Sequence, residues 1–255
     1  MRKAVLTLLA SLAASSTVFA AGERTYEVTV TNITAGQAFT PIIAATHSSS
    51  IGFFELGQPA SAELEMLAEG GNTMPLEDLL NANPSVVSDV ATTSGLLGPG
   101  ETVTLYIEGK LRHDVLSFAA MLLPTHDTFV AVDSVPLPVK YASTHAVAYD
   151  AGTEVNDESC ANIPGPYCMG APYSPEDGEG FVHVANGIHG IGDLAEIKRS
   201  TLIRVVGALV SLAMSRRVVT PLLLAMSLRV TARKHEATPA ETSSPEERGD
   251  HRIGV

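Results

Sequence analysis

Three acidic residues in two short motifs have the side chains most able to do chemistry in this sequence. The first motif, P-T-H-D-T-F-V, contains Asp127. The second, D-A-G-T-E, begins with Asp150 and ends with Glu154. Hard cations such as Ca²⁺ take several oxygen ligands at once, and carboxylates commonly supply them. The motifs therefore indicate a calcium site, while the common use of Asp in turns stays open as the alternative.

The second motif has a backbone suited to holding two ligands on one ion. Gly152 permits a tight turn between Asp150 and Glu154, which would bring both carboxylates to the same side. Two or three carboxylates neutralise a divalent ion, and backbone carbonyls or water can complete a shell of about six to eight oxygens. Three residues close behind this motif could substitute for its ligands or add to them: Asn156, Asp157 and Glu158.

The first 20 residues predict a signal peptide. Arg2 and Lys3 give a basic start, and an uncharged, mostly apolar stretch follows. Val18 and Ala20 place small residues at the −3 and −1 positions of a cleavage site. We therefore expect a protein that is secreted, or periplasmic or part of the cell envelope, without a transmembrane anchor.

Charge is distributed unevenly along the chain. Residues 21–194 contain 22 Asp and Glu against 4 Lys and Arg, whereas residues 195–255 contain 10 Lys and Arg against 6 Asp and Glu. A strongly acidic body repels nucleic acid and attracts cations. We expect no nucleic-acid partner, and most of the carboxylates are expected on a solvated surface.

The two cysteines, Cys160 and Cys168, enclose a short segment rich in Pro and Gly. An exported chain meets oxidising conditions, so a disulfide is expected. Closing so small a loop contributes about 2–3 kcal/mol to stability by chain-entropy arithmetic. A reactive thiol pair is the alternative, although the spacing is not Cys-x-x-Cys.

Short segments of strand character predict a mostly β domain. Residues 26–33 and 101–108 alternate or are rich in β-branched residues, as expected of strands with one buried face. Helical spacing and capping residues predict short helices at 59–71 and 75–82. This order favours an antiparallel β-sandwich with a short helical insertion over a βαβ sheet. Further strands are expected at 39–47, 115–123, 129–135 and 181–185.

Catalytic and zinc motifs are not evident in the sequence. It has no H-E-x-x-H, no Gly-x-Ser-x-Gly and no phosphate-binding loop. His47, His183 and His189 invite a zinc interpretation, but packing against the edge of the sandwich is the expected role. A serine hydrolase triad is defined in space and not by order, so composition does not exclude one. We predict a protein that is not an enzyme, with a metal-assisted hydrolase at the same acidic loops as the alternative.

The sequence changes character after Leu194. Residues 205–215 and 218–228 are uncharged runs on either side of Arg216 and Arg217. An eleven-residue helix is about 16 Å long, roughly half of a bilayer core, and two central arginines would be costly there. We predict an atypical C-terminal segment, 195–255, helix-like at first and disordered from Arg233 onward. Two hypotheses stay open for it: a genuine extension, or residues read out of frame.

Residues 23–194 resemble the spondin N-terminal domain in the version found in exported bacterial proteins. The resemblance rests on the two acidic motifs and on F-T-P-I-I-A-A-T-H, F-E-L-G-Q-P-A-S and V-A-N-G-I-H-G-I-G-D-L, which occur in the family's order. Family members usually close with a further strand, often around a Trp-Arg-Asn-Pro sequence, and this chain has no Trp.

The resemblance implies a fold, a ligand set and a function. It implies a C2-like antiparallel β-sandwich with one Ca²⁺ bound near its loop end by Asp127, Asp150 and Glu154. Glu154 stands where the family has an aspartate, and its side chain is one methylene longer. We therefore expect a signal peptide at 1–20 and a spondin-type domain at 21–194. The expected function is a calcium-binding adhesion or ligand-binding module for an extracellular or envelope protein or glycan.

Overall fold

The computed structural model describes residues 22–112, 114–195 and 208–214, so the expected signal peptide and the residues beyond Arg233 lie outside the described part. Ten strands, two α-helices and two short 3₁₀ helices, at Cys160–Asn162 and Gly192–Leu194, make up this part. The strands and α-helices are β1 (Glu23–Asn32), β2 (Ala38–Phe39), β3 (Ile43–Ser48), α1 (Ala62–Gly70), α2 (Met74–Asn81), β4 (Val87–Thr92), β5 (Thr102–Lys110), β6 (Asp114–Leu123), β7 (Thr128–Pro136), β8 (Tyr141–Asp150), β9 (His183–Val184) and β10 (Ala208–Met214).

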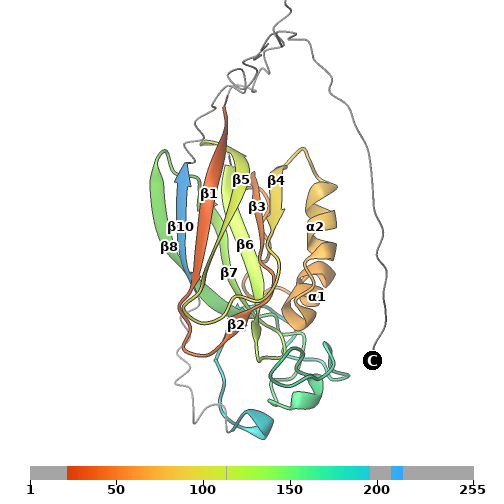
Figure 1. Ribbon diagram of the computed structural model, residues 1–255. Helices are drawn as coiled ribbons and strands as arrows, with labels where there is room; N and C mark the ends of the chain where they lie inside the picture. The colour runs from red at the N-terminus through yellow and green to blue at the C-terminus, as the bar shows by residue number, and fades with distance from the viewer. Residues whose placement is uncertain (1–21, 113, 196–207, 215–255) are drawn as a thin grey trace, which may run out of the picture. The chain divides into compact units, whose positions relative to one another are not determined.

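The strands pair antiparallel in the order β4-β3-β6-β7-β8-β10-β1-β5, with β2 beside β6 and β9 beside β8 (Figure 1). Strand β8 belongs to both layers of the resulting sandwich. Its residues 147–150 pair with β7, and its residues 141–146 pair with β10. The end of β8 that carries Asp150 is therefore held by β7, and the other end by β10.

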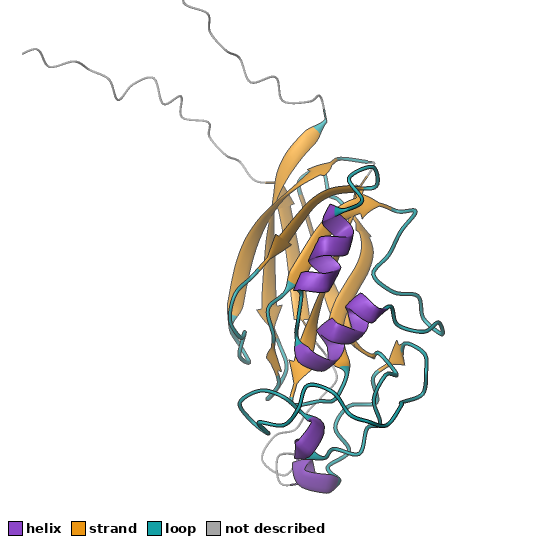
Figure 2. Cartoon of the chain, turned by 90° about the vertical axis from the view of Figure 1, so that its right-hand side faces the viewer, coloured by secondary structure: helices purple, strands orange, loops and turns teal. Residues whose placement is uncertain are grey.

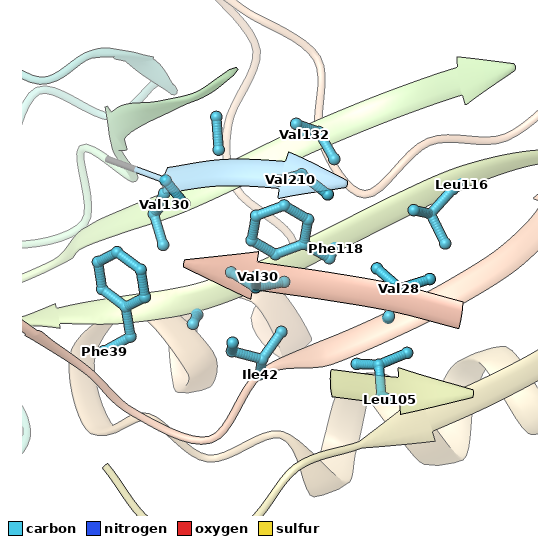
Figure 3. Close-up of a cluster of buried hydrophobic side chains, with 14 of the residues drawn as sticks. Val28, Val30, Phe39, Ile42, Leu105, Leu116, Phe118, Val130, Val132 and Val210 are labelled. Atoms are coloured by element: carbon cyan, nitrogen blue, oxygen red, sulfur yellow. The ribbon is translucent and has the colours of Figure 1, made fainter. Parts of the chain in front are cut away.

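The main core lies between the two layers of strands (Figure 3). Tyr26, Val28 and Val30 point inward from β1 at every second position, which is why the alternating sequence forms this strand. They pack in one cluster with residues of β6 and β10, including Phe118 and Val210. Burying these apolar side chains provides the main driving force for closing the sandwich.

A second core lies between the outer face of β3, β6 and β7 and the two helices (Figure 2). Leu64 and Leu67 of α1 and Leu76 and Leu80 of α2 pack over Phe129 and its neighbours. Strand β6 is consequently buried on both faces, so its sequence is a nearly continuous apolar run without alternation.

Both ends of α1 and the start of α2 carry the expected signals. The Ser61 hydroxyl accepts a hydrogen bond from the Leu64 amide at 3.2 Å, and Gly71 takes the left-handed conformation that ends α1. Pro75 lies in the first turn of α2. The predicted helical insertion is therefore confirmed at both segments.

The predicted mostly β, antiparallel fold is confirmed, with differences in detail. The predicted strand at 39–47 is divided, because Pro41 lies between β2 and β3. The predicted late strand at 181–185 is reduced to the two residues of β9. Strands β4 and β8 were not expected. Among the described residues, no helix has the length and apolar character needed to span a bilayer.

Part of the expected atypical C-terminal segment is a strand of the sandwich. Residues 208–214 form β10, which pairs with β1 on one side and β8 on the other. The helix-like expectation is wrong for these residues. Ala208, Val210 and Leu212 are fully buried, but the outward positions are also uncharged, so composition hides the period of two.

Candidate metal centre

The strand register brings the two acidic motifs together. Strand β7 begins at Thr128, strand β8 ends at Asp150, and these two residues are paired across the antiparallel ladder. Asp127, which directly precedes β7, therefore lies beside Asp150 at the loop end of the sandwich. The Ala151 amide also donates to the Asp127 carbonyl at 3.2 Å, which extends the pairing into the loop.

Asp127 holds the D-A-G-T-E turn with one oxygen and has no partner for the other. Its Oδ2 accepts hydrogen bonds from the amides of Thr153 and Glu154, at 2.7 and 3.1 Å. Its Oδ1 is buried and accepts no hydrogen bond, and the residue is 0% exposed. Burial, reinforced by the charge of Asp150, raises the pKa of Asp127 to about 7.

Asp150 closes the same turn from its other end. Its Oδ1 accepts from the Gly152 amide at 2.9 Å, and its Oδ2 accepts from the Asn156 side-chain amide at 2.9 Å. Gly152 is in the left-handed region, and a Cβ there would collide with the Phe181 carbonyl oxygen. Burial raises the pKa of the Asp150 carboxyl.

Glu154 is 1% exposed, and neither of its carboxylate oxygens makes a hydrogen bond of normal geometry. His126 Nδ1 lies 3.7 Å from Oε2. Burial, followed by the charge of Glu69, raises the pKa of Glu154 to about 7, although nearby Ser174 opposes the change. Asp127 raises this pKa further, so the two carboxylates repel each other electrostatically.

His126 supplies little positive charge to this cluster. Its Nε2 lies 3.1 Å from Asp157 Oδ1, but burial lowers the pKa of the imidazole despite that neighbour. Among the described residues, no lysine or arginine forms an ion pair with Asp127, Asp150 or Glu154. Asp127 and Glu154 are therefore buried carboxylates without a lysine or arginine partner among the described residues.

Asp150 also belongs to a second group of possible ligand atoms. One ligand atom each from Asp150, Glu179 and His183 lies within 4.8 Å of the other two. His183 Nε2 is 3.5 Å from Asp150 Oδ1 and 3.8 Å from Glu179 Oε2. Asp127 and Glu154 are outside this group. The three residues form a candidate acidic metal-binding triad that includes one of the three predicted ligands.

The Spondin_N family model matches residues 26–159. The chain belongs to the spondin N-terminal domain family. Both acidic motifs fall within the matched part of this spondin domain, whereas Glu179 and His183 follow it. A comparison with curated proteins found no match.

Sequence reasoning missed Glu179 and His183 in this spondin domain. His183 was expected to pack at the edge of the sandwich, and β9 does pair with the end of β8, where His183 is opposite Asp150. The short apolar segment around His183 was the available signal, because it predicted a strand. Without the register of that strand, nothing in the sequence connects it to Asp150.

A cavity of ≈ 100 Å³ opens beside the cluster, and both acidic residues of the triad line it. Glu158, a candidate additional ligand, is used in another way. Its carboxylate accepts hydrogen bonds from the amides of His189, Gly190 and Ile191 and so holds that loop in place. The other residues lining the cavity include His126, Asn156 and Glu158.

The spondin domain also contains a buried Ser and a buried His in contact with a half-buried Asp. His47 Nε2 lies 2.7 Å from Ser117 Oγ, and this hydroxyl donates to Asp133 Oδ1 at 3.0 Å. In a hydrolase triad the histidine lies between the serine and the carboxylate, whereas here the serine is in the middle. Because His47 and Ser117 are 0% exposed, the three residues form a structural network.

The predicted Cys160–Cys168 disulfide is present and joins the ends of a loop that follows the second acidic motif. It is confirmed against the alternative of a reactive thiol pair, because the described residues contain no free cysteine. A disulfide of this kind is typical of extracellular domains.

Proposed function

We propose that this spondin domain is an extracellular ligand-binding or adhesion module whose loop end is ordered by one Ca²⁺. Asp127, Asp150 and Glu154 are its proposed ligands. The observation that supports this proposal is a set of buried carboxylate oxygens that make no hydrogen bond of normal geometry, Oδ1 of Asp127 and both oxygens of Glu154.

The energetics of burial support a cation at this place. A carboxylate removed from water without a partner is strongly unfavourable, and it responds by taking up a proton or binding a cation. The pKa values of Asp127 and Glu154, raised to about 7, describe the first response. Extracellular Ca²⁺ supplies the second, with backbone carbonyls and water completing the oxygen shell.

The proposed role of the ion is structural. Asp127 already ties the turn before Glu154 through two backbone amides, and a shared ion would add a further link between the β7 and β8 ends. The family, the disulfide and the acidic surface support export and a partner outside the cytoplasm, either a protein or a glycan.

Calcium titration of the purified protein, by calorimetry and thermal unfolding, tests the proposal. Ca²⁺ at about 100 times its Kd should stabilise the wild type by about 2.7 kcal/mol. Asp127→Asn keeps the hydrogen-bond acceptor but loses the charge, so it should lose most of this response. Asp78→Asn, on the exposed face of α2, is the matched control and should respond like the wild type. An equal calcium response in all three proteins contradicts the proposed site.

The alternative function is a metal-assisted hydrolase, and the cavity beside Asp150 is the observation that favours it. A metal ion with an open coordination position could activate water there. Hydrolysis of ester and phosphoester substrates that is lost in Asp150→Asn would support this alternative. Absence of such hydrolysis in calcium-loaded protein would leave the binding module as the function.

A further inference from the structure

We propose that Asp150, Glu179 and His183 form a second cation site, which takes a divalent transition-metal ion of the Zn²⁺ class. This site is distinct from the proposed calcium site and shares only Asp150 with it. Glu179 and His183 follow the matched part of the family domain, so the site is built on a loop outside that match.

The backbone places the three side chains on one side of the β8 end. Strand β9 pairs with β8 so that His183 is opposite Asp150, and Glu179 precedes His183 by four residues. The Glu179 side chain is 43% exposed and that of His183 is 21% exposed. An ion can therefore reach the group from solvent, and Asp150 and Glu179 also line the adjacent cavity.

Two of the three separations between the ligand atoms are close to those of a bound ion, and the third is within 4.8 Å. Ligand atoms about 2.0–2.1 Å from a tetrahedral zinc ion lie roughly 3.3 Å from one another. The observed separations from His183 Nε2 are 3.5 Å to Asp150 and 3.8 Å to Glu179. Small side-chain rotations would bring both carboxylates to bonding distance, since Glu179 is at the surface.

The orientation of the imidazole is independent evidence for a ligand. His183 Nδ1 lies 3.0 Å from the Val184 carbonyl oxygen, which can only accept a hydrogen bond, so Nδ1 carries a proton. When the ring is neutral, this proton leaves the lone pair on Nε2, which faces the two carboxylates. Nε2 is buried and makes no hydrogen bond of normal geometry, and a second proton there, which the carboxylates favour by raising the pKa of the imidazole, would compete with a metal ion. A backbone carbonyl that fixes the tautomer in this way is the usual second shell of a metal-binding histidine.

The ligand types favour a transition metal over calcium. Imidazole nitrogen suits zinc and its neighbours, whereas Ca²⁺ takes oxygen ligands. One histidine and two carboxylates leave a fourth position open for water. The competing explanation is a proton on Nε2, which would make His183 the cation of an ion pair with both carboxylates.

Cobalt binding to the full-length protein tests the proposal, with saturating Ca²⁺ present so that the calcium site is occupied. Co²⁺ should bind at one ion per chain with visible absorption, and Zn²⁺ should displace it. Loss of a ligand should weaken Co²⁺ binding at least as much as the loss of a second-shell partner, which costs about 10–100-fold. We expect this loss in His183→Gln and in Glu179→Gln, and the second variant should fold normally because the Glu179 side chain is 43% exposed.

Two control variants separate this proposal from the calcium site. His145→Gln changes an exposed histidine on the same strand as Asp150 and should bind Co²⁺ like the wild type. Asp127→Asn should retain Co²⁺ while losing Ca²⁺, and His183→Gln should do the reverse. Absence of Co²⁺ binding by the wild type, or unchanged binding by His183→Gln, would overturn the second site and leave a histidine–carboxylate ion pair. Loss of the Ca²⁺ response alone would overturn only the proposed function.

Discussion

Two polar clusters of this domain both contain fully buried side chains but differ in their hydrogen bonding. The inner network consists of His47, Ser117 and Asp133, and the loop-end cluster contains Asp127 and Glu154. His47, Ser117 and Asp127 are 0% exposed and Glu154 is 1% exposed. In the inner network the buried side-chain polar atoms have hydrogen-bond partners, whereas three carboxylate oxygens of the loop-end cluster make no hydrogen bond of normal geometry. Burial alone therefore does not distinguish the two clusters, whereas their hydrogen bonding does.

The difference has a thermodynamic meaning. A fully hydrogen-bonded buried network stabilises the fold under all conditions, while a partly satisfied one costs free energy until a proton or cation completes it. The inner network should therefore be insensitive to calcium and the loop-end cluster sensitive to it. The predictions below would break or sharpen this contrast.

The largest effect is expected from Asp133→Ala in the inner network. The substitution removes the acceptor of the Phe53 amide and of the Ser117 and Ser134 hydroxyls. We expect a loss of about 2–3 kcal/mol and a Tm lower by roughly 5–10 °C. Thermal unfolding should show the same loss in Ca²⁺ and in chelator. A loss seen in only one of these conditions would show that the two clusters are coupled.

A smaller effect is expected from pH in the metal-free protein. The folded-state pKa values of Asp127 and Glu154 are raised to about 7, above unfolded values of about 4. Protonation therefore favours the folded state, so this contribution is complete below about pH 4 and is lost as pH rises through about 7. Relative to the double variant Asp127→Asn/Glu154→Gln, wild-type Tm in chelator should fall by several degrees between pH 5 and pH 8. Parallel curves for the two proteins would contradict the raised pKa values.

The next effect is expected from removing the charge of Glu154 alone. Glu154→Gln removes the charge that Glu69 and Asp127 repel, so it should raise Tm in chelator at pH 8 by about 1–3 °C. In Ca²⁺ the same variant should be less stable than the wild type, because it has lost a proposed ligand. Equal destabilisation of this variant in Ca²⁺ and in chelator would show that Glu154, like the inner network, stabilises the fold without calcium.

The smallest effect is expected from Glu69→Gln on α1. Glu69 raises the pKa of Glu154 but is not a proposed ligand, and burial raises its own pKa. Differential scanning fluorimetry at pH 8 in chelator should show a Tm rise of about 1 °C, in the same direction as Glu154→Gln. Its calcium response should stay intact, and loss of that response would add Glu69 to the ligands.

The sequence predicts the elements of this fold where large apolar or β-branched residues mark the buried positions. Strands β1 and β5 alternate clearly and were expected, as were both helices. Strand β8 was missed because its buried positions include the small residues Ala146 and Ala148, while Val147 faces outward. Strand β10 was missed because its outward positions are uncharged as well, so the sequence shows no alternation. We propose that the domain extends through Met214, beyond the expected boundary at 194.

The candidate site was predictable only where its residues lie in motifs. Asp127, Asp150 and Glu154 were identified from two motifs, and the structure places them at one end of the sandwich, although their common calcium ion stays a prediction. Glu179 and His183 could not be predicted, because strand register connects them to Asp150 and spacing along the chain carries no register.

The position of β10 has a consequence for shortened forms of the chain. Residues 208–214 fill the gap between β1 and β8. A chain that lacks them has two unpaired strand edges facing each other, and its Tyr26, Val28 and Val30 lack part of their cover. The sandwich can therefore close only when these residues are present, and a chain cut before residue 208 should be prone to aggregate.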